Sequence, residues 1–160
     1  GEFRNGVEFY ADELDGVERI VGRDRQLMTV ENKTSYMRCH DENTSYFYLG
    51  GYANRFQREF LRKVFDDNPE IAYLHFGDID AGGFYILQHL RNKTGIAFVP
   101  YCMDVKTLKA NIQYTKKLTE NDKKRLAVLA ETEFGETVEF MLEHNCKLEQ
   151  EAMDLMEIGI

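Results

Sequence analysis

The spacing of apolar residues divides most of this chain into short β-strands that alternate with helices. Compact runs of β-prone and apolar side chains predict four strands, at residues 27–30, 46–49, 71–76 and 96–99. Between the second and third runs, apolar residues recur at the spacing of one buried helix face over residues 54–65. The polar, proline-containing stretch 66–69 is expected to end that helix.

Further helices are expected after the third strand and through the last third of the chain. Apolar residues between Phe84 and Leu90 predict a helix that ends near residues 92–95. The remaining predicted helices run from a cap at residues 119–122 to Leu129, over residues 136–143 and over residues 148–156. Residues 1–24 show little periodicity, and a short helix around residues 11–20 is the one element expected there.

This order of elements predicts an α/β fold. Strands that alternate with helices favour a mainly parallel, four-stranded sheet with right-handed crossovers and helices on both faces, followed here by C-terminal helices. The nearly continuous apolar run at residues 71–76 is typical of a central strand that is covered on both sides. We expect a poorly defined N-terminal segment over residues 1–24 and a single domain over residues 25–160, which is the usual size for one domain.

Composition narrows the class of protein. Hydrophobic residues make up 43% and charged residues 30% of the chain, as in ordinary globular proteins. No apolar run approaches the roughly 20 residues that cross a bilayer, so we expect a cytoplasmic protein without a membrane partner. Three widely spaced cysteines indicate neither a disulfide framework nor a zinc site. The start at Gly1-Glu2-Phe3, without Met, suggests a piece excised from a longer protein.

The net charge of -8 makes the isolated chain a poor candidate for binding DNA, because electrostatic DNA binding usually needs a basic face. If the substrate is a polyanion, the positive charge must come from metal ions, from a partner chain or from a local basic cluster. The candidate cluster consists of Lys116, Lys117, Lys123, Lys124 and Arg125.

Candidate chemistry lies where the predicted strands end, since ligands of open parallel sheets sit beyond the carboxyl ends of the strands. Asp78 and Asp80 follow the third strand, and residues two apart in an extended chain project to the same side. Two such close carboxylates repel unless a proton or a cation lies between them, and hard oxygen ligands suit Mg²⁺ or Mn²⁺. Glu31 directly follows the first strand. If the first and third strands are neighbours, Glu31 lies near Asp78 and Asp80. It then completes a metal site or moves a proton.

Plainer interpretations stay open for each residue. Asp80 also suits a helix N-cap, and Glu31 a solvated charge. Glu149 and Glu151 could add ligands from a C-terminal helix, or could form an exposed charged helix face. His75 and His89 are expected to be packed, with their polar atoms satisfied. The tyrosines at positions 46, 48, 52, 73 and 85 are expected to be packed in the core or at its edge, although one of them could act as a covalent nucleophile.

A strand that ends in Glu, followed by a later strand that ends in Asp-x-Asp, resembles the Toprim domain of topoisomerases, bacterial primases, OLD-family nucleases and RecR-type repair proteins. Four runs are similar to one branch, the C-terminal Toprim domain of JetD-like proteins, the nuclease subunit of Wadjet anti-plasmid systems. These runs are Val30-Glu31-Asn32, Leu49-Gly50-Gly51-Tyr52, His75-Phe76-Gly77-Asp78-Ile79-Asp80-Ala81-Gly82-Gly83 and Leu148-Glu149-Gln150-Glu151. That domain is itself similar to the Toprim domain of type IIB topoisomerase A subunits, and the resemblance covers about residues 25–155.

The resemblance implies that Glu31, Asp78 and Asp80 bind catalytic Mg²⁺ or Mn²⁺, with Glu151 or Glu149 as an extra ligand. It implies a metal-dependent DNA endonuclease domain that acts against plasmids, and condensin-like complex subunits as partners. Two alternatives remain. One is a non-catalytic Toprim module that binds nucleic acid or partners. The other is topoisomerase-like strand cleavage, which needs a tyrosine from a domain that does not fit upstream of residue 25.

Overall fold

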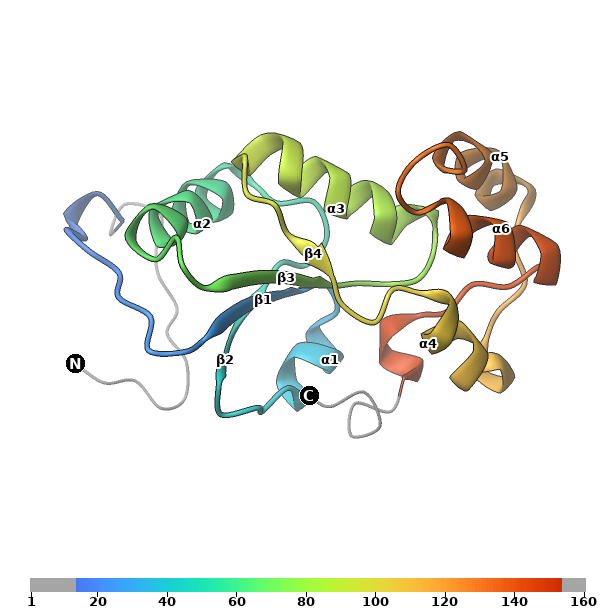
Figure 1. The fold of residues 1–160 in the computed structure, drawn as a ribbon, viewed down its shortest axis with the longest axis horizontal. Helices are drawn as coiled ribbons and strands as arrows, with labels where there is room; N and C mark the ends of the chain where they lie inside the picture. Colours follow the sequence, from blue (N-terminus) through green and yellow to red (C-terminus); the bar gives the residue numbers. More distant parts are fainter. Residues whose placement is uncertain (1–13, 154–160) are drawn as a thin grey trace.

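A parallel sheet at the centre of the molecule organises the fold, as the computed structural model shows for residues 14–153 (Figure 1). The strands are β1 (Gln26–Val30), β2 (Thr44–Tyr48), β3 (Ala72–Phe76) and β4 (Val99–Pro100). Their order in the sheet is β2-β1-β3-β4, and every neighbouring pair is parallel. The predicted four-stranded α/β fold is therefore confirmed, and β3 is the central strand that its apolar sequence indicated.

Helices cover both faces of this sheet. Helix α1 (Lys33–Arg38) connects β1 outward to β2, whereas α2 (Arg55–Asp67) and α3 (Ala81–Thr94) connect strands in the opposite direction across the sheet. Because such crossovers are right-handed, the two directions place their helices on opposite faces. Helices α2 and α3 accordingly lie side by side on the upper face in Figure 1, with α1 below.

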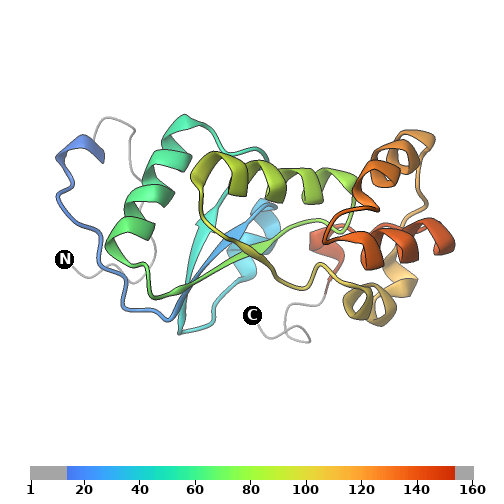
Figure 2. The same cartoon turned by 45° about the horizontal axis from the view of Figure 1, so that its top comes forward.

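The last third of the described chain forms a helical group at one end of the sheet (Figure 2). It contains α4 (Val105–Ala110), the 3-10 turn η2 (Ile112–Tyr114), α5 (Glu120–Leu129) and α6 (Gly135–His144). Helices α5 and α6 confirm the prediction, and Thr119 with Asp122 forms the expected cap of α5. The six-residue α4 is too short to give a periodic signal in the sequence. Between residues 14 and 153, no helix has both the length and the apolar character needed to cross a membrane.

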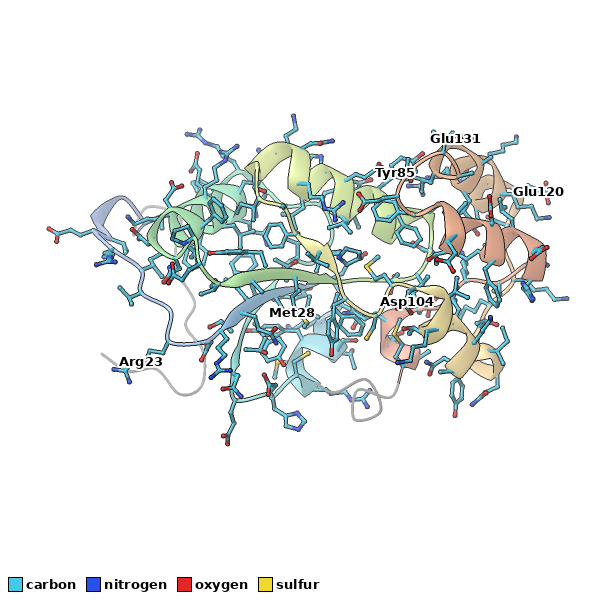
Figure 3. The ribbon with its side chains drawn as sticks, viewed as in Figure 1. Arg23, Met28, Tyr85, Asp104, Glu120 and Glu131 are labelled. Atoms are coloured by element: carbon cyan, nitrogen blue, oxygen red, sulfur yellow. The ribbon has the colours of Figure 1, made fainter. Side chains whose placement is uncertain are left out.

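The core joins the sheet to α3. Met28, which is labelled in Figure 3, and Phe76 are fully buried on neighbouring strands. Phe84, Leu87 and Leu90 on α3 are also fully buried. These are the apolar residues that predicted the elements, so the same side chains both form the helix and strands and hold them together.

The predicted strand at residues 96–99 is wrong except at its last residue. Strand β4 comprises only Val99 and Pro100, which pair with Leu74 and His75. The amide of Phe98 bonds to the carbonyl of Ile96 at 2.9 Å, and this tight turn takes the preceding residues out of the ladder. Ile96 and Phe98 are buried nonetheless. Their apolar character therefore reflects core packing, not strand pairing.

Two predicted helices are also wrong within the described residues. Leu148 pairs with Ile79 as an antiparallel bridge, and Gln150–Ala152 is the 3-10 turn η3, so no helix spans the described part of residues 148–156. Residues 154–156 lie outside the described range. Near the other end, the predicted helix at residues 11–20 is reduced to the 3-10 turn η1 (Leu14–Gly16), with residues 11–13 outside the description. The amide of Ile20 instead donates to Asp67 on α2 at 2.8 Å.

A close backbone approach joins the end of β3 to α3 and requires glycine at position 83. A Cβ atom on Gly83 would lie 2.1 Å from the carbonyl oxygen of Asp78. Such an overlap can be relieved only by moving the backbone, so Gly83 allows α3 to begin directly against the segment that carries the aspartates.

We predict that Gly83→Ala lowers the free energy of unfolding by roughly 2–4 kcal/mol, because the added methyl group displaces backbone. Gly82→Ala is the matched control in the same helical turn, where the nearest neighbour is the Asp80 side chain at 3.1 Å. That control is expected to change stability by about 1 kcal/mol or less, since alanine favours a helix. Urea unfolding of both variants measures the difference. Equal losses would contradict the account of this turn.

Candidate metal centre

The ends of β1 and β3 bring the first two candidate carboxylates to one edge of the sheet. Val30 and Phe76 are register partners, and the amide of Glu31 donates to the carbonyl of Phe76 at 3.1 Å. Glu31 and Asp78 both line an open depression at this edge. The condition set for Glu31 is therefore met: the first and third predicted strands are neighbours in the sheet.

Glu31 carries a carboxylate oxygen with an unmet need for a partner. Its Oε2 atom is buried and has no hydrogen-bond partner among residues 14–153. A Cβ atom on Gly77 would lie 2.8 Å from this oxygen, so glycine there leaves the space that the carboxylate occupies. Burial, and after it the negative charge of Asp78, raises the pKa of Glu31 to about 7, although the backbone amide of Asp78 opposes this shift. A proton or a cation is therefore favoured beside Glu31.

Asp78 is held by a segment from the other end of the chain. Its Oδ1 atom accepts a hydrogen bond of 2.7 Å from the backbone amide of Gln150. Burial raises the pKa of Asp78 to about 6, against the effect of that amide, and the charges of Asp80, Glu149 and Glu151 raise it further. Negative charge accumulates at this edge, and no Lys or Arg within residues 14–153 forms an ion pair with Asp78.

Asp80 forms a helix N-cap, which was the plainer interpretation of its position, and it also lies near the site. It is the N-cap of α3, where its Oδ1 atom accepts a hydrogen bond of 2.8 Å from the amide of Gly83. Its backbone is extended, with φ of -148° and ψ of 177°. Its charge contributes to the raised pKa values of both Glu31 and Asp78, but it does not line the depression. The cap engages one oxygen and leaves Oδ2 for a ligand.

Glu149 and Glu151 do not lie on the predicted helix: Glu151 is part of the 3-10 turn η3, and Glu149 precedes that turn. Glu149 flanks η3 and forms an ion pair with Lys116 at 2.5 Å. Glu151 is exposed, and its Oε2 atom lies 3.4 Å from Nδ2 of Asn32. Neither residue lines the depression. Their charges reach Asp78, but the structure does not bring them into contact with it.

The donor set fits a hard divalent cation. In their present positions, no three His, Cys, Asp or Glu side chains within residues 14–153 form a complete ligand group. Glu31 and Asp78 nevertheless both line the same depression at the carboxyl edge of the sheet, and burial raises the pKa of each. Mg²⁺ typically takes one or two protein carboxylates and completes its octahedron with water or substrate oxygens. The residues present are thus compatible with Mg²⁺ or Mn²⁺.

The depression has room for a substrate beside the carboxylates. Its volume is about 350 Å³, and its other walls are formed by Asn32, Lys33, Thr34, Tyr48, Gly50 and Gly51. Tyr48 is 40% exposed and Tyr52 is 55% exposed, so the expectation that they are packed is wrong. The packed interpretation holds for Tyr73, which is buried, and for Tyr46 and Tyr85, which are partly buried against the core.

Gln150 is the residue of this site that the sequence did not reveal. Its side chain is fully buried, its Oε1 atom accepts from the amide of Asn32 at 2.8 Å, and its Nε2 atom donates to the carbonyl of Phe76 at 3.0 Å. A glutamine between two glutamates in an expected helix gives no local signal for burial. The one indication in the sequence was the run Leu148-Glu149-Gln150-Glu151, which resembles JetD-like proteins.

The two histidines that flank the acidic motif are packed, as expected, but the expectation that their polar atoms are satisfied is wrong for Nε2 of His75, which is buried and has no hydrogen-bond partner within residues 14–153. His75 is fully buried, its Nδ1 atom lies 2.9 Å from the Thr29 hydroxyl, and burial lowers its pKa to about 3, so the ring is neutral. His89 packs edge-on against the Tyr52 ring. The three cysteines, Cys39, Cys102 and Cys146, form no disulfide, in agreement with the sequence.

Much of the basic cluster is already engaged within the chain. Lys116 pairs with Glu149, and Lys123 pairs with Glu120. The Arg125 guanidinium lies 5.0 Å from the centroid of the Tyr85 ring, which is labelled in Figure 3. The cluster therefore offers less free positive charge than its sequence indicates.

Fold and site together define a class: a parallel α/β domain with acidic residues at the carboxyl edge of its sheet. The family model "Wadjet protein JetD, C-terminal" matches residues 5–158. The chain belongs to this family. Over 161 aligned residues it is 26% identical to the Wadjet protein JetD of Bacillus cereus (strain Q1), covering 96% of this chain. The match covers 39% of that relative, so the chain spans about two fifths of its length.

The raised pKa of Glu31 predicts how pH affects the stability of the metal-free protein. Above the ordinary pKa of 4.5 the unfolded chain loses this proton, whereas the folded protein keeps it up to about pH 7. The native state then binds more protons, so the free energy of unfolding falls as pH rises through this window. Asp78 acts in the same direction up to about pH 6.

We therefore expect Glu31→Gln to be less sensitive to pH than the wild type, and more stable than it above pH 7, when a chelator is present. Glu139→Gln, at an exposed position on α6, is the matched control and should follow the wild type. Urea unfolding at about pH 5 and about pH 8 measures both. A Glu31→Gln profile parallel to that of the wild type would contradict the protonation account.

Proposed function

We propose that this chain is a divalent-metal-dependent DNA endonuclease domain, over residues 25–160, that hydrolyses phosphodiester bonds in defence against plasmids. The observation that carries the proposal is the meeting of two desolvated carboxylates, Glu31 and Asp78, in the lining of one open depression. Their mutual repulsion has no purpose in a purely structural acidic pair, whereas a divalent cation relieves it. Membership in the JetD C-terminal family supports the defence role.

In this proposal, Glu31 and Asp78 are the principal ligands, and Asp80 contributes through the oxygen that its helix cap leaves unused. A bound divalent cation supplies activation of water and neutralisation of charge on the scissile phosphate. The chain itself fixes the two carboxylates at adjoining strand ends and keeps one side open to a DNA backbone. Lys33 forms part of that open wall and has an exposed side chain, so it places a positive charge where a phosphate enters.

Delivery of DNA is assigned to partners. The chain carries a net charge of -8, and several cations of its basic cluster already have acidic or aromatic partners. Such a domain does not attract DNA by itself. We propose that condensin-like subunits of a Wadjet system bring DNA to the carboxylates.

Plasmid cleavage tests this function. The intact protein with its partner subunits should cut circular DNA in Mg²⁺ or Mn²⁺, and Asp78→Ala should reduce the rate by about 100-fold or more, as expected when a main electrostatic group is removed. Asp66→Ala, at an exposed aspartate on α2, is the matched control and should cut normally. Equal cutting by Asp78→Ala and the wild type would overturn the nuclease proposal.

Tyr48 provides a separate test between hydrolysis and topoisomerase-like cleavage, because its exposed ring lines the same depression as Glu31 and Asp78. Hydrolysis uses water as the nucleophile, so Tyr48→Phe, which removes only the hydroxyl, should change the cleavage rate by about twofold or less. The measurement is plasmid cleavage followed by denaturing electrophoresis with and without protease. Loss of cutting in Tyr48→Phe, together with protein bound covalently to the wild-type product, would favour a tyrosine mechanism instead.

A further inference from the structure

Gln150 joins both acidic strand ends through three hydrogen bonds. Its side-chain oxygen accepts from the Asn32 amide, one residue after Glu31, and its side-chain nitrogen donates to the Phe76 carbonyl, two residues before Asp78. Its own backbone amide donates to the Asp78 carboxylate. The residue is fully buried, so these contacts are shielded from competing water.

We propose that Gln150 is the positioning residue of the metal centre: it sets the distance and direction between the carboxylates of Glu31 and Asp78. This inference rests on the proposed function, since it concerns the affinity of the same centre for its cation. Outer partners that orient metal ligands commonly affect metal affinity by about 10- to 100-fold when they are removed.

The segment that carries Gln150 is itself fixed against the aspartate motif. Ile79 donates to the carbonyl of Leu148 at 2.8 Å, and Leu148 donates back to the carbonyl of Ile79 at 3.1 Å. These two backbone bonds place residue 150 beside residue 78. The orientation of Asp78 is therefore imposed by backbone from a distant part of the sequence, which is stiffer than a flexible side-chain partner.

The side chain of Gln150 has a different task from its backbone. The β1–β3 ladder ends with the hydrogen bond from Glu31 to Phe76, and neither segment continues as a strand beyond it. The side-chain carboxamide of Gln150 links the two segments at this point. It accepts a hydrogen bond from the backbone amide of Asn32 and donates one to the carbonyl of Phe76. Without that bridge, Glu31 and Asp78 stay on neighbouring strands but lose their fixed separation.

The test is Mn²⁺ binding to the chain, measured by calorimetry, in the wild type and in Gln150→Met. Methionine keeps the volume but makes neither side-chain hydrogen bond, so the dissociation constant should rise by about 10- to 100-fold. In metal-free protein, the amide of Asn32 should exchange its hydrogen faster in this variant. Gln113→Ala, at an exposed glutamine of η2, is the control and should bind Mn²⁺ as the wild type does.

Gln150→Ala is a second variant for the same measurement, in case Gln150→Met does not fold. The smaller alanine leaves space for water molecules that can bond to the amide of Asn32 and the carbonyl of Phe76. If the folded Gln150 variants bind Mn²⁺ as tightly as the wild type, the positioning role is wrong. A general loss of structure would lower plasmid cleavage at every Mn²⁺ concentration, whereas a positioning defect is rescued by excess Mn²⁺. Absence of Mn²⁺ binding by the wild type overturns the proposed function, and this inference with it.

Discussion

The parallel pairing of β1 with β3 is the constraint on which the rest of the site depends. It places Val30 opposite Phe76, so the residues that follow leave the sheet at one edge. Glu31 and Asp78 are thereby forced together, and burial raises the pKa of both. A fold that only required stability would avoid this arrangement, because two desolvated carboxylates repel each other. The arrangement is reasonable if a cation belongs between them.

The segment from Asp78 to Gly83 contains one of these repelling carboxylates and also has a structural role. Asp80 caps α3, and Gly83 allows the first turn of that helix to pass against the carbonyl of Asp78. The helix thus begins within the site, and its packing against the core through Phe84 and Leu87 holds the motif in place. From the other side, the Leu148–Gln150 segment fixes Asp78 by backbone contacts. The carboxylates are preorganised by elements from three separate parts of the chain.

The structural features that could be predicted from sequence are those determined by residues close together in the chain. Strands β1 and β3 and helix α2 follow from apolar spacing within a few residues, and the meeting of Glu31 with Asp78 follows from the geometry of parallel sheets. Gln150 could not be predicted, because its partners Phe76 and Asn32 are 74 and 118 residues away. The same long-range bonds explain why residues 148–153 do not form the predicted α-helix: Leu148 pairs with Ile79 instead. Ile96 and Phe98 caused a strand to be predicted where none exists. A buried residue outside the sheet has the same apolar character as a residue of a buried strand.

The central claim is that the adjoining strand ends hold a divalent cation. Crystals of the chain soaked in Mn²⁺ and measured for anomalous scattering test it most directly. The account predicts an anomalous peak within coordination distance of the Glu31 and Asp78 carboxylates, in the depression beside Tyr48. An ordered site with no peak there at saturating Mn²⁺, or a peak only elsewhere on the molecule, would contradict it.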